Sequence, residues 1–569
     1  MSPAASSILD GPRSKIRAGR GSALRARNWR TEGLLRAFEN VLEVGENPAE
    51  LIVYASLGKA ARNWAQAKRI AQALLELQED QTLVLQSGAA VGVLQTSPHA
   101  PKVISAVNNT VGRWSDSERF YSRAKAGLTI WGGLTAGAWQ YIGRQGVLQG
   151  TYELLRIIAE RHFGGAEPSD VKGRWLLTSG LGGMGSSQPI SARLLGLSSI
   201  TVEADPDKIV RAKAAGVVDV VAGTLAEALA ALHEARASER TIAIALEGNA
   251  ADIYQQVVSI EDLPSFVTDQ TAAHDARYGY IPSGYTVTAW HRLREEQSEQ
   301  VERDARASIA TEVEAMLQLQ AAGAVVFENG NNLRVQALEH LGAKESDRVA
   351  AIPGFMEYLR PAFSRGIGPF RWIALSGDPG DLAVLDDLAA DLFRPEVTRW
   401  INLARTGVPT QGLPARSCWL GHGERSEIAA RANELYAAGR LKAPILFTRD
   451  HLDAAGMTNP RIGTENMRDG SDGVTDWPLL DALALAASGA DLVAIHSGGG
   501  GYSGWMQSAG VSVIADGTSE AETRVRKSLD ADTSVGILRY ATAGYEDAAH
   551  IAAESDLLTW FDTEEAPNA

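Results

Sequence analysis

The sequence contains a single cysteine and no long apolar run, and each shortage excludes a class of protein. One cysteine, Cys418, cannot form an internal disulfide, which is typical of a reducing compartment. The longest apolar stretch, GLTIWGGLTAGAW from Gly127, covers about thirteen residues and is too short to span a bilayer. The formal net charge of −15 argues against a nucleic-acid partner. We therefore expect a cytoplasmic protein that binds neither nucleic acid nor membrane.

The chain is long and ordinary in composition. Its 569 residues exceed what one hydrophobic core supports, so we expect about two to four domains. A hydrophobic content of 45% and a charged content of 22% are typical of a globular protein. The N-terminal segment is basic, which an organelle transit peptide would also be. We interpret residues 1–27 as a flexible, solvated arm carrying Arg13, Lys15, Arg17, Arg20, Arg25 and Arg27.

A glycine-rich turn is the most informative motif. An apolar run from Trp175 leads into residues 180–185, GLGGMG, whose spacing is G-x-G-x-x-G, and Glu203 follows about twenty residues later. Glycines at this spacing allow a tight bend and close approach to a pyrophosphate, while the acid accepts from a ribose hydroxyl. The pattern predicts NAD rather than NADP, because an acid and not an arginine stands near the ribose. An ordinary glycine-rich loop is the alternative.

Strand and helix patterns alternate from about residue 171, as in βαβ units on a parallel sheet. The expected strands are RWLLTSG, ITVEADP, VVDVVAG, TIAIALEGN and SFVTDQ, and polar residues follow two of them at 247–249 and 269–274. A charged helix over 292–320 and a strand over 324–332 close the pattern. We therefore expect an α/β protein in which a Rossmann-like domain (146–350) is inserted between the two parts of a larger α/β core domain (28–145 and 351–569).

Polar clusters outside this domain could carry chemistry. They are Tyr54 with RNW at 62–64, GPFRW around Arg371, PARSCW around Cys418, RDHLD at 449–453 and IHSGGGG from Ile495. Arg371 could equally form a structural ion pair, and Cys418 could be a small buried hydrophobe. RDHLD contains three potential ligands within four residues, which rarely converge on one ion, so we expect no metal.

These segments resemble the urocanase (urocanate hydratase) family, from about Asn28 to Asp562. The matching runs include GKAARNW, LQSGAAVGVLQT, TAGAWQYIGRQGVLQGTYE, KGRWLLTSGLGGMG, VTDQTAAHD, GLPARSCWLGHGER and DGSDGVTDWPLL. The resemblance implies a urocanase-like fold and a hydro-lyase that works as a homodimer. It also implies that tightly bound NAD+ acts as an electrophile: the substrate imidazole adds to the nicotinamide ring, and water then adds to the side chain.

Site residues follow from the same resemblance. It implies catalytic roles for Cys418, beside the cofactor, and for Asp453, which handles the proton. Arg371 resembles the arginine that holds the substrate carboxylate, and Tyr54 and Thr135 fall in segments that border the substrate. The implied NAD+ contacts are Gly183, Met184, Gly185, Glu203, Asn249, Ala250, Gln270, Thr271, Ala272, Ala273, His274, Tyr280, Ile281 and Gly499.

The chain departs from the family pattern around the ligands. Gly133 stands where the family has a glutamine, Ser497 and Ser508 replace two histidines, and Trp505 replaces a tyrosine. These changes predict a larger, more apolar substrate site, and aromatic groups make favourable contacts with sulfur. We expect hydration of a ring-substituted urocanate, such as a thio or S-methylthio derivative, to an imidazolone propionate-type product. Urocanate itself is the first alternative, an NAD-dependent dehydrogenase the second, and a catalytically silent NAD-binding protein the third.

Overall fold

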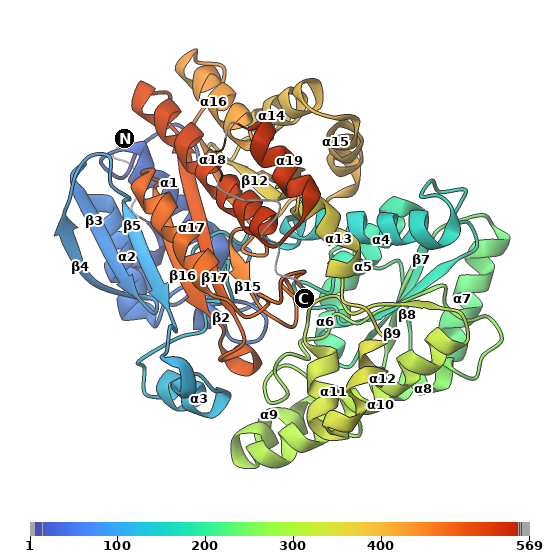
Figure 1. Ribbon diagram of the computed structural model, residues 1–569. Coiled ribbons are helices and arrows are strands. Elements are labelled where there is room, and N and C mark those ends of the chain that lie inside the picture. Colours follow the sequence, from blue (N-terminus) through green and yellow to red (C-terminus); the bar gives the residue numbers. More distant parts are fainter. Residues whose placement is uncertain (1–5, 14, 556, 558, 560–569) are drawn as a thin grey trace. The chain divides into compact units, whose positions relative to one another are not determined.

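The computed structural model describes residues 6–13, 15–555, 557 and 559, and the chain divides into two compact units. Unit 1 comprises Met1–Gly146 and Arg360–Ala569, and unit 2 is the intervening Val147–Leu359 (Figure 1). The unit inserted into the chain therefore ends at Leu359, beyond the expected boundary at 350. Helices that follow the last strand of unit 2 continue to contact its other helices, which extends the unit.

Unit 2 is built on a six-stranded sheet with the strand order β11-β10-β6-β7-β9-β8. Every neighbouring pair is parallel, which confirms the expected α/β architecture. The strands are β6 (Trp175–Ser179), β7 (Ser198–Glu203), β8 (Val220–Ala222), β9 (Ala243–Glu247), β10 (Phe266–Val267) and β11 (Val325–Val326). All residues of β6 and β7 are buried, as expected for a parallel sheet covered on both faces.

Helices connect these strands, and one of them differs from expectation. The helix expected over 292–320 is two helices, because Gln297 leaves the helical region with φ −138° between Glu296 and Ser298. The helices are α4 (Leu148–Phe163), α5 (Ser187–Leu195), α6 (Pro206–Ala214), α7 (Leu225–Ala237), α8 (Ala250–Val257), α9 (Val287–Glu296), α10 (Ser298–Ala321), α11 (Leu333–Leu341) and α12 (Ser346–Ala350); α13 (Met356–Phe363) crosses into unit 1.

Unit 1 contains a mixed nine-stranded sheet with the order β13-β12-β14-β17-β16-β5-β3-β4, and β15 pairs with β17. The pairs β16–β5 and β3–β5 are parallel, and the others are antiparallel. The strands are β3 (Gln81–Gln86), β4 (Ala89–Gln95), β5 (Val103–Val107), β12 (Gly368–Ala374), β13 (Ala415–Leu420), β14 (Ile445–Arg449), β15 (Met457–Thr458), β16 (Leu492–Ser497) and β17 (Gln507–Ala515); β1 (Ile52–Tyr54) and β2 (Gly58–Lys59) form a separate hairpin.

Helices cover this sheet, and α16, α17 and α18 contact its central strand β17 (Figure 1). The helices are α1 (Trp29–Glu43), α2 (Trp64–Glu76), α3 (Ser117–Lys125), α14 (Pro379–Leu392), α15 (Pro395–Gly407), α16 (Glu424–Ala437), α17 (Asp476–Ala487), α18 (Ser519–Thr542) and α19 (Glu546–Glu554). The short 3-10 turns of unit 1 are η1 (Ser7–Asp10), η2 (Pro48–Glu50), η3 (Gly112–Trp114), η4 (Arg144–Gly146) and η6 (Gly500–Tyr502), and η5 (Ala343–Glu345) belongs to unit 2. Among the described residues, no helix combines the length and apolar character needed to cross a bilayer.

The basic N-terminal segment is not the solvated arm expected from its charge. Where the structure describes it, this segment packs against α1: Ile8 and Ile16 are buried, and the Arg25 side chain is only 9% exposed. Arg25 donates to Glu32 at 3.0 Å and to Glu39 at 2.9 Å. Buried acids on α1 therefore hold the segment to unit 1 through Arg25, while its other bases, Arg13, Lys15, Arg17, Arg20 and Arg27, are exposed. Residues 1–5 and 14 lie outside the described residues.

Candidate active site

The residues expected to contact a dinucleotide in unit 2 follow the ends of four neighbouring strands. The turn at 180–185 follows β6, Glu203 ends β7, Asn249 follows β9 and Gln270 follows β10. These strands are parallel and adjacent in the order β10-β6-β7-β9, so their carboxyl ends lie at one edge of the sheet. The chain adds β7 on one side of β6 and later β10 on the other. Open α/β sheets bind ligands at such a reversal of strand order.

The glycines of the turn are required by close packing. Gly180 has φ +89°, and a Cβ there would lie 2.6 Å from the carbonyl oxygen of Gln270. A Cβ on Gly185 would lie 2.2 Å from the carbonyl oxygen of Gly180. Gly183 and Met184, between them, are only half-buried. The turn therefore folds tightly against the end of β10 and leaves its middle residues accessible.

Glu203 holds this turn in place. Its Oε2 accepts a hydrogen bond from the Leu181 amide at 2.7 Å, and its Oε1 accepts one from the Asp205 amide at 2.9 Å. The carboxylate is 6% exposed. Each oxygen keeps a lone pair for a further donor such as a ribose hydroxyl. Glu203 is thus a structural partner of the turn, and its predicted cofactor contact stays a prediction.

Asn249 and Ala250 form the start of α8. Asn249 is the N-cap, and its side-chain oxygen accepts from the Ala251 amide at 3.0 Å. Its Nδ2 donates to the carbonyl oxygen of Ile281 at 2.8 Å. This bond ties the end of β9 to the loop at 280–281, so three of the expected cofactor residues lie together at the sheet edge.

The segment from Gln270 to His274 is fixed by side chains from other loops. Asn329 Nδ2 donates to Gln270 Oε1 at 2.6 Å, and the Thr271 hydroxyl donates to Asp269 at 2.8 Å. Ala273 is fully buried and Ala272 is half-buried. Burial lowers the pKa of His274 to about 4, so its imidazole is neutral at pH 7.

Two buried acids beneath this segment are functional candidates that sequence reasoning missed. Asp269 and Glu312 are 1% and 0% exposed. The Ser179 hydroxyl contacts both carboxyls, and the Tyr280 hydroxyl donates to Glu312 at 2.8 Å. Burial raises the pKa of Asp269, and burial together with Asp269 raises the pKa of Glu312 well above its ordinary value. A mid-helix glutamate 133 residues from Ser179 gives no sequence signal of this contact.

In unit 1, Arg371 lies on β12 and is 1% exposed. Its Nη1 donates to the carbonyl oxygen of Gln140 at 3.0 Å, and its Nη2 donates to that of Gly146 at 3.3 Å. Nη2 also forms an ion pair with Asp450, 79 residues away in sequence. Among the described residues, Nε has no hydrogen-bond partner. Arg371 is therefore in a structural ion pair and still has one N–H available for a ligand.

Tyr54, Thr135 and Gly133 come together beside this pair. Thr135 donates to the Tyr54 hydroxyl oxygen through its amide at 3.3 Å and through its hydroxyl at 3.2 Å. A Cβ on Gly133, where φ is +52°, would lie 3.3 Å from that same oxygen. Burial raises the pKa of Tyr54; Asp450 adds to this effect and Arg371 opposes it. Four of the expected substrate residues, Tyr54, Thr135, Gly133 and Arg371, thus share one neighbourhood, which also includes Asp450.

Cys418 is a buried thiol on β13, opposite Phe370 of β12. Burial raises its pKa, so the thiolate that a nucleophile requires is disfavoured. The charges that act on it are those of Arg394, Asp386, Glu424 and Arg416. These surroundings match the small buried hydrophobe that we kept as an alternative, and the predicted catalytic role stays a prediction.

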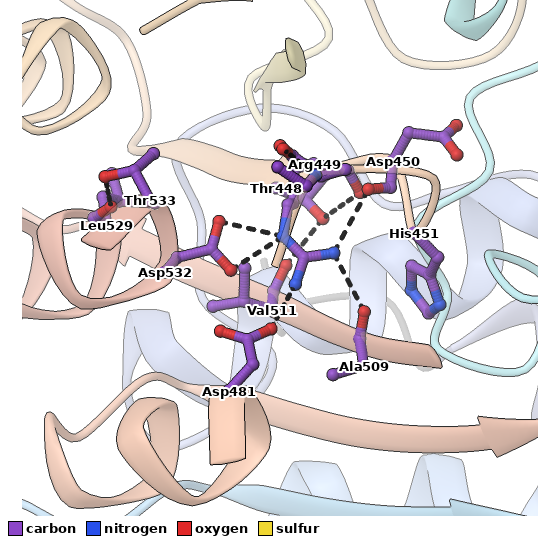
Figure 2. Close-up of polar contacts among 12 residues, drawn as sticks. Thr448, Arg449, Asp450, His451, Asp481, Ala509, Val511, Leu529, Asp532 and Thr533 are labelled. Carbon is purple, nitrogen blue, oxygen red and sulfur yellow. Dashed lines mark hydrogen bonds and ion pairs between the residues drawn. The ribbon is translucent and has the colours of Figure 1, made fainter. Parts of the chain in front are cut away.

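Asp453 lies in the turn after β14 and is 5% exposed. Its Oδ2 forms an ion pair with Arg425 Nη1 at 2.6 Å. The end of β14 is fixed by Arg449, which donates to Asp532, Asp481 and the carbonyl oxygens of Ala509 and Asp450 (Figure 2). The buried ion pairs of Arg449 therefore fix the segment that carries Asp450 and Asp453.

The residues that depart from the family pattern have varied surroundings. Ser497 donates to the carbonyl oxygen of Met506 at 3.2 Å, and buried Ser508 lies 3.4 Å from His451 Nδ1. Trp505 is 36% exposed, and the Arg461 guanidinium lies 5.3 Å from its ring centroid.

Gly499, the expected cofactor contact in unit 1, lies in close packing. A Cβ on Gly499 would lie 2.4 Å from Trp131 Cβ, so this position requires glycine.

Two buried histidines also occur here. His451 Nε2 donates to Gln140 Oε1 at 2.5 Å, and the His451 ring lies 5.1 Å from that of His496. Burial lowers the pKa of His451 well below its ordinary value and that of His496 to about 3. Within the described residues, no group of three histidine, cysteine or acidic side chains is arranged to hold a metal ion.

The fold and these clusters indicate the class of protein: an α/β enzyme in which a Rossmann-like unit is inserted into the sequence of a second α/β unit. Three family models cover the chain. The Urocanase N-terminal domain matches residues 16–140, the Urocanase Rossmann-like domain 143–359 and the Urocanase C-terminal domain 361–554. The chain belongs to the urocanase family, and its domains indicate a hydro-lyase of the urocanase type.

Proposed function

We propose that this hydratase holds NAD+ at the carboxyl edge of the unit 2 sheet and hydrates an imidazole acrylate that carries a ring substituent. The observation that carries the cofactor assignment is the convergence of four neighbouring strand ends on the turn at 180–185. Glu203, Asn249 and Gln270 stand at the other three ends. An acidic side chain at the end of the second strand suits a ribose hydroxyl.

In this proposal, unit 2 binds and orients the cofactor. Amide groups of the turn and of the α5 N-terminus would face the pyrophosphate, and Glu203 would accept from the ribose. Bound NAD+ supplies an electrophilic nicotinamide ring. Neutral His274 and the half-buried Met184 add no charge to the cofactor site.

Unit 1 supplies the substrate contacts. The free Nε–H of Arg371 would donate to the substrate carboxylate, which is a charge-assisted bond. Tyr54 and Thr135 would orient the substrate beside it, and Asp453 would take up and return the proton from water. Cys418, as a neutral thiol, would contribute contact rather than negative charge.

The preference for a ring substituent rests on the replaced residues. Gly133 has no side chain where a Cβ would approach the Tyr54 hydroxyl at 3.3 Å, so the surroundings of Tyr54 are less crowded than with glutamine. Ser497 and Ser508 are smaller than histidine, and Trp505 adds aromatic surface that suits sulfur. One extra methyl-sized group in an apolar site contributes about 1–3 kcal/mol of discrimination.

The cofactor assignment is tested on the purified protein. We expect denaturation of the protein to release NAD+, which mass spectrometry identifies. We expect the amount of bound NAD+ to be the same before and after turnover. Accumulation of NADH with turnover would instead select the dehydrogenase alternative. Full activity of protein shown to contain no dinucleotide would refute the proposal.

The substrate assignment is tested by kinetics. We expect kcat/KM for 2-thio- or 2-methylthio-urocanate to exceed that for urocanate by roughly 10-fold or more, from the discrimination of one methyl-sized group. Product formation is followed by loss of the acrylate absorbance. A clear preference for plain urocanate would select the first alternative, a urocanate hydratase of histidine degradation.

We also propose a cytoplasmic homodimer, on the basis of the family resemblance. The total charge of −15 supports a soluble assembly without nucleic acid. Light scattering coupled to size exclusion should give twice the chain mass of 60.7 kDa, and a value equal to one chain would refute the dimer.

A further inference from the structure

Five charged side chains of unit 1 form a continuous buried series that we call the charge chain. It runs from Asp481 through Arg449, Asp532 and Arg425 to Asp453. Arg449 donates to Asp481 at 2.6 Å and to both oxygens of Asp532 at 2.7 and 2.8 Å. Arg425 reaches Asp532 at 3.2 Å and Asp453 at 2.6 Å. Figure 2 shows the part of it around Arg449.

The charge chain holds more acids than bases. Its members are 0–5% exposed, so water cannot compensate an unbalanced charge. Three carboxyl groups face two guanidinium groups, and full ionisation would leave one uncompensated negative charge. One of the three carboxyls should therefore keep its proton.

The surroundings of Asp481 identify the carboxyl that keeps it. Among the described residues, no group donates a hydrogen bond to its buried Oδ1, while its Oδ2 accepts from Arg449. The Asp481 carboxyl group also lies within hydrogen-bonding reach of the Asp532 carboxyl group. The charged groups that face Asp481 are Arg449, Asp532 and Asp453. All three acids pair with a guanidinium, but both oxygens of the other two are occupied. Asp532 has Arg449 and Arg425 against its oxygens. Asp453 has the Ala454 amide at Oδ1 and the Arg425 guanidinium at Oδ2. Burial and the Asp532 charge raise the pKa of Asp481 well above its ordinary value.

We propose that Asp481 is a neutral carboxylic acid whose O–H donates to Asp532, and that Asp532 and Arg425 are positioning residues for Asp453. The second part rests on the proposed function, in which Asp453 handles the proton. With Asp481 protonated, two carboxylates balance two guanidiniums. The charge chain then holds Asp453 in place as the carboxylate partner of Arg425.

The backbone supports the same assignment. Arg449 Nη1 donates at 3.1 Å to the carbonyl oxygen of Asp450, which also accepts from the Asp453 amide at 3.3 Å. The guanidinium that joins Asp481 and Asp532 therefore also fixes the turn in which Asp453 lies. A change at Asp532 acts on Asp453 by two routes, through Arg425 and through this turn.

The test compares two matched variants, Asp481→Asn and Asp532→Asn, with Asp476→Asn on the exposed start of α17 as control. An amide replaces a carboxylic acid closely, so Asp481→Asn should stay within about 2 °C of the wild-type Tm at pH 7. Asp532→Asn leaves guanidiniums uncompensated and should lower Tm by roughly 5 °C or more. Equal losses of Tm in the two variants would overturn the proposal.

A pH series tests the proton itself and does not depend on activity. A carboxyl whose folded-state pKa is raised contributes stability below its unfolded pKa, and this contribution is lost as pH rises toward the folded pKa. Wild type should therefore lose Tm more steeply than Asp481→Asn between about pH 5 and 9. Parallel curves for the two proteins would overturn the neutral assignment, even if Asp532→Asn fails to fold.

Kinetics test the positioning role. Asp532→Asn should lower kcat by roughly 10-fold or more with little change in KM and should shift the pH profile of kcat, whereas Asp481→Asn should alter neither. An unchanged kcat and pH profile in Asp532→Asn would overturn the positioning role. Absence of hydratase activity in wild type would refute the proposed function, while the pH series would still decide the state of Asp481.

Discussion

The two units differ in how some of their buried acids are neutralised, although both also use arginine, as in the Glu328–Arg334 pair of unit 2. In unit 1, buried carboxylates pair with arginine: Asp386 with Arg416 at 2.6 Å, and Asp532 with Arg449 at 2.7 Å. In unit 2, Asp269 and Glu312 are surrounded by the hydroxyls of Ser179, Tyr280 and Thr271 and by the amide of Asn331. Hydroxyls cannot cancel a charge, and burial raises the pKa of both carboxyls, which favours their protonated forms.

Each arrangement suits the part of the unit in which the acids lie. Arginines in unit 1 fix the segments that carry Asp450 and Asp453, because a guanidinium bonds several elements at once. In unit 2 a fully ionised acid pair would place two negative charges beneath the turn at 180–185. The raised pKa values of both acids favour a lower charge at the edge where we propose that an anionic dinucleotide binds.

The largest effect should come from Arg449→Met, which breaks the arginine-based scheme. Removing the guanidinium leaves Asp532 buried with fewer partners and should lower the free energy of unfolding of unit 1 by about 3–5 kcal/mol. Urea unfolding followed by tryptophan fluorescence measures it. Arg431→Met, at an exposed position of α16, is the control and should change little. A loss no larger than that of the control would show that Arg449 is not needed for charge balance.

Arg371→Ala should have the next largest effect, which is on substrate binding rather than on stability. It removes the proposed partner of the substrate carboxylate, so KM should rise by roughly 30- to 150-fold, equivalent to about 2–3 kcal/mol. Asp453→Asn should instead lower kcat and leave KM nearly unchanged. Steady-state kinetics separate the two, with Arg365→Ala at an exposed position as control. Wild-type kinetics in both variants would refute these assignments.

The smallest effect should come from Glu312→Gln, which tests the acids of unit 2 that are surrounded by hydroxyls. An amide in place of a protonated acid should change the free energy of unfolding by less than about 1 kcal/mol at pH 7. Because the folded-state pKa of Glu312 is raised, wild type should lose stability as pH rises above the ordinary glutamate value of 4.5, and the variant should lose less. Thermal unfolding across pH measures this, with Glu299→Gln at the exposed start of α10 as control. A steeper loss in the variant would contradict the raised pKa of Glu312.

Local patterns in the sequence predicted the elements that depend on neighbouring residues. The alternation of apolar strands and helices gave the parallel sheet of unit 2, and the spacing from Gly180 to Gly185 marked the turn after β6. The prediction of a single helix over 292–320 was wrong, because the chain leaves the helical conformation at Gln297 and the apolar periodicity does not indicate this break. The basic N-terminal segment was misjudged because its partners, Glu32 and Glu39, are buried on α1.

The family, the class of fold and the position of the glycine turn follow from the sequence alone, because these depend on long matching runs and on short-range spacing. Only the tertiary structure decided which charges meet. Arg371 meets Asp450 across 79 residues, Arg449 meets Asp532 across 83, and Ser179 meets Glu312 across 133. Burial and strand order set these encounters, and the same burial determines which acids keep a proton. Periodicity along the chain carries neither piece of information.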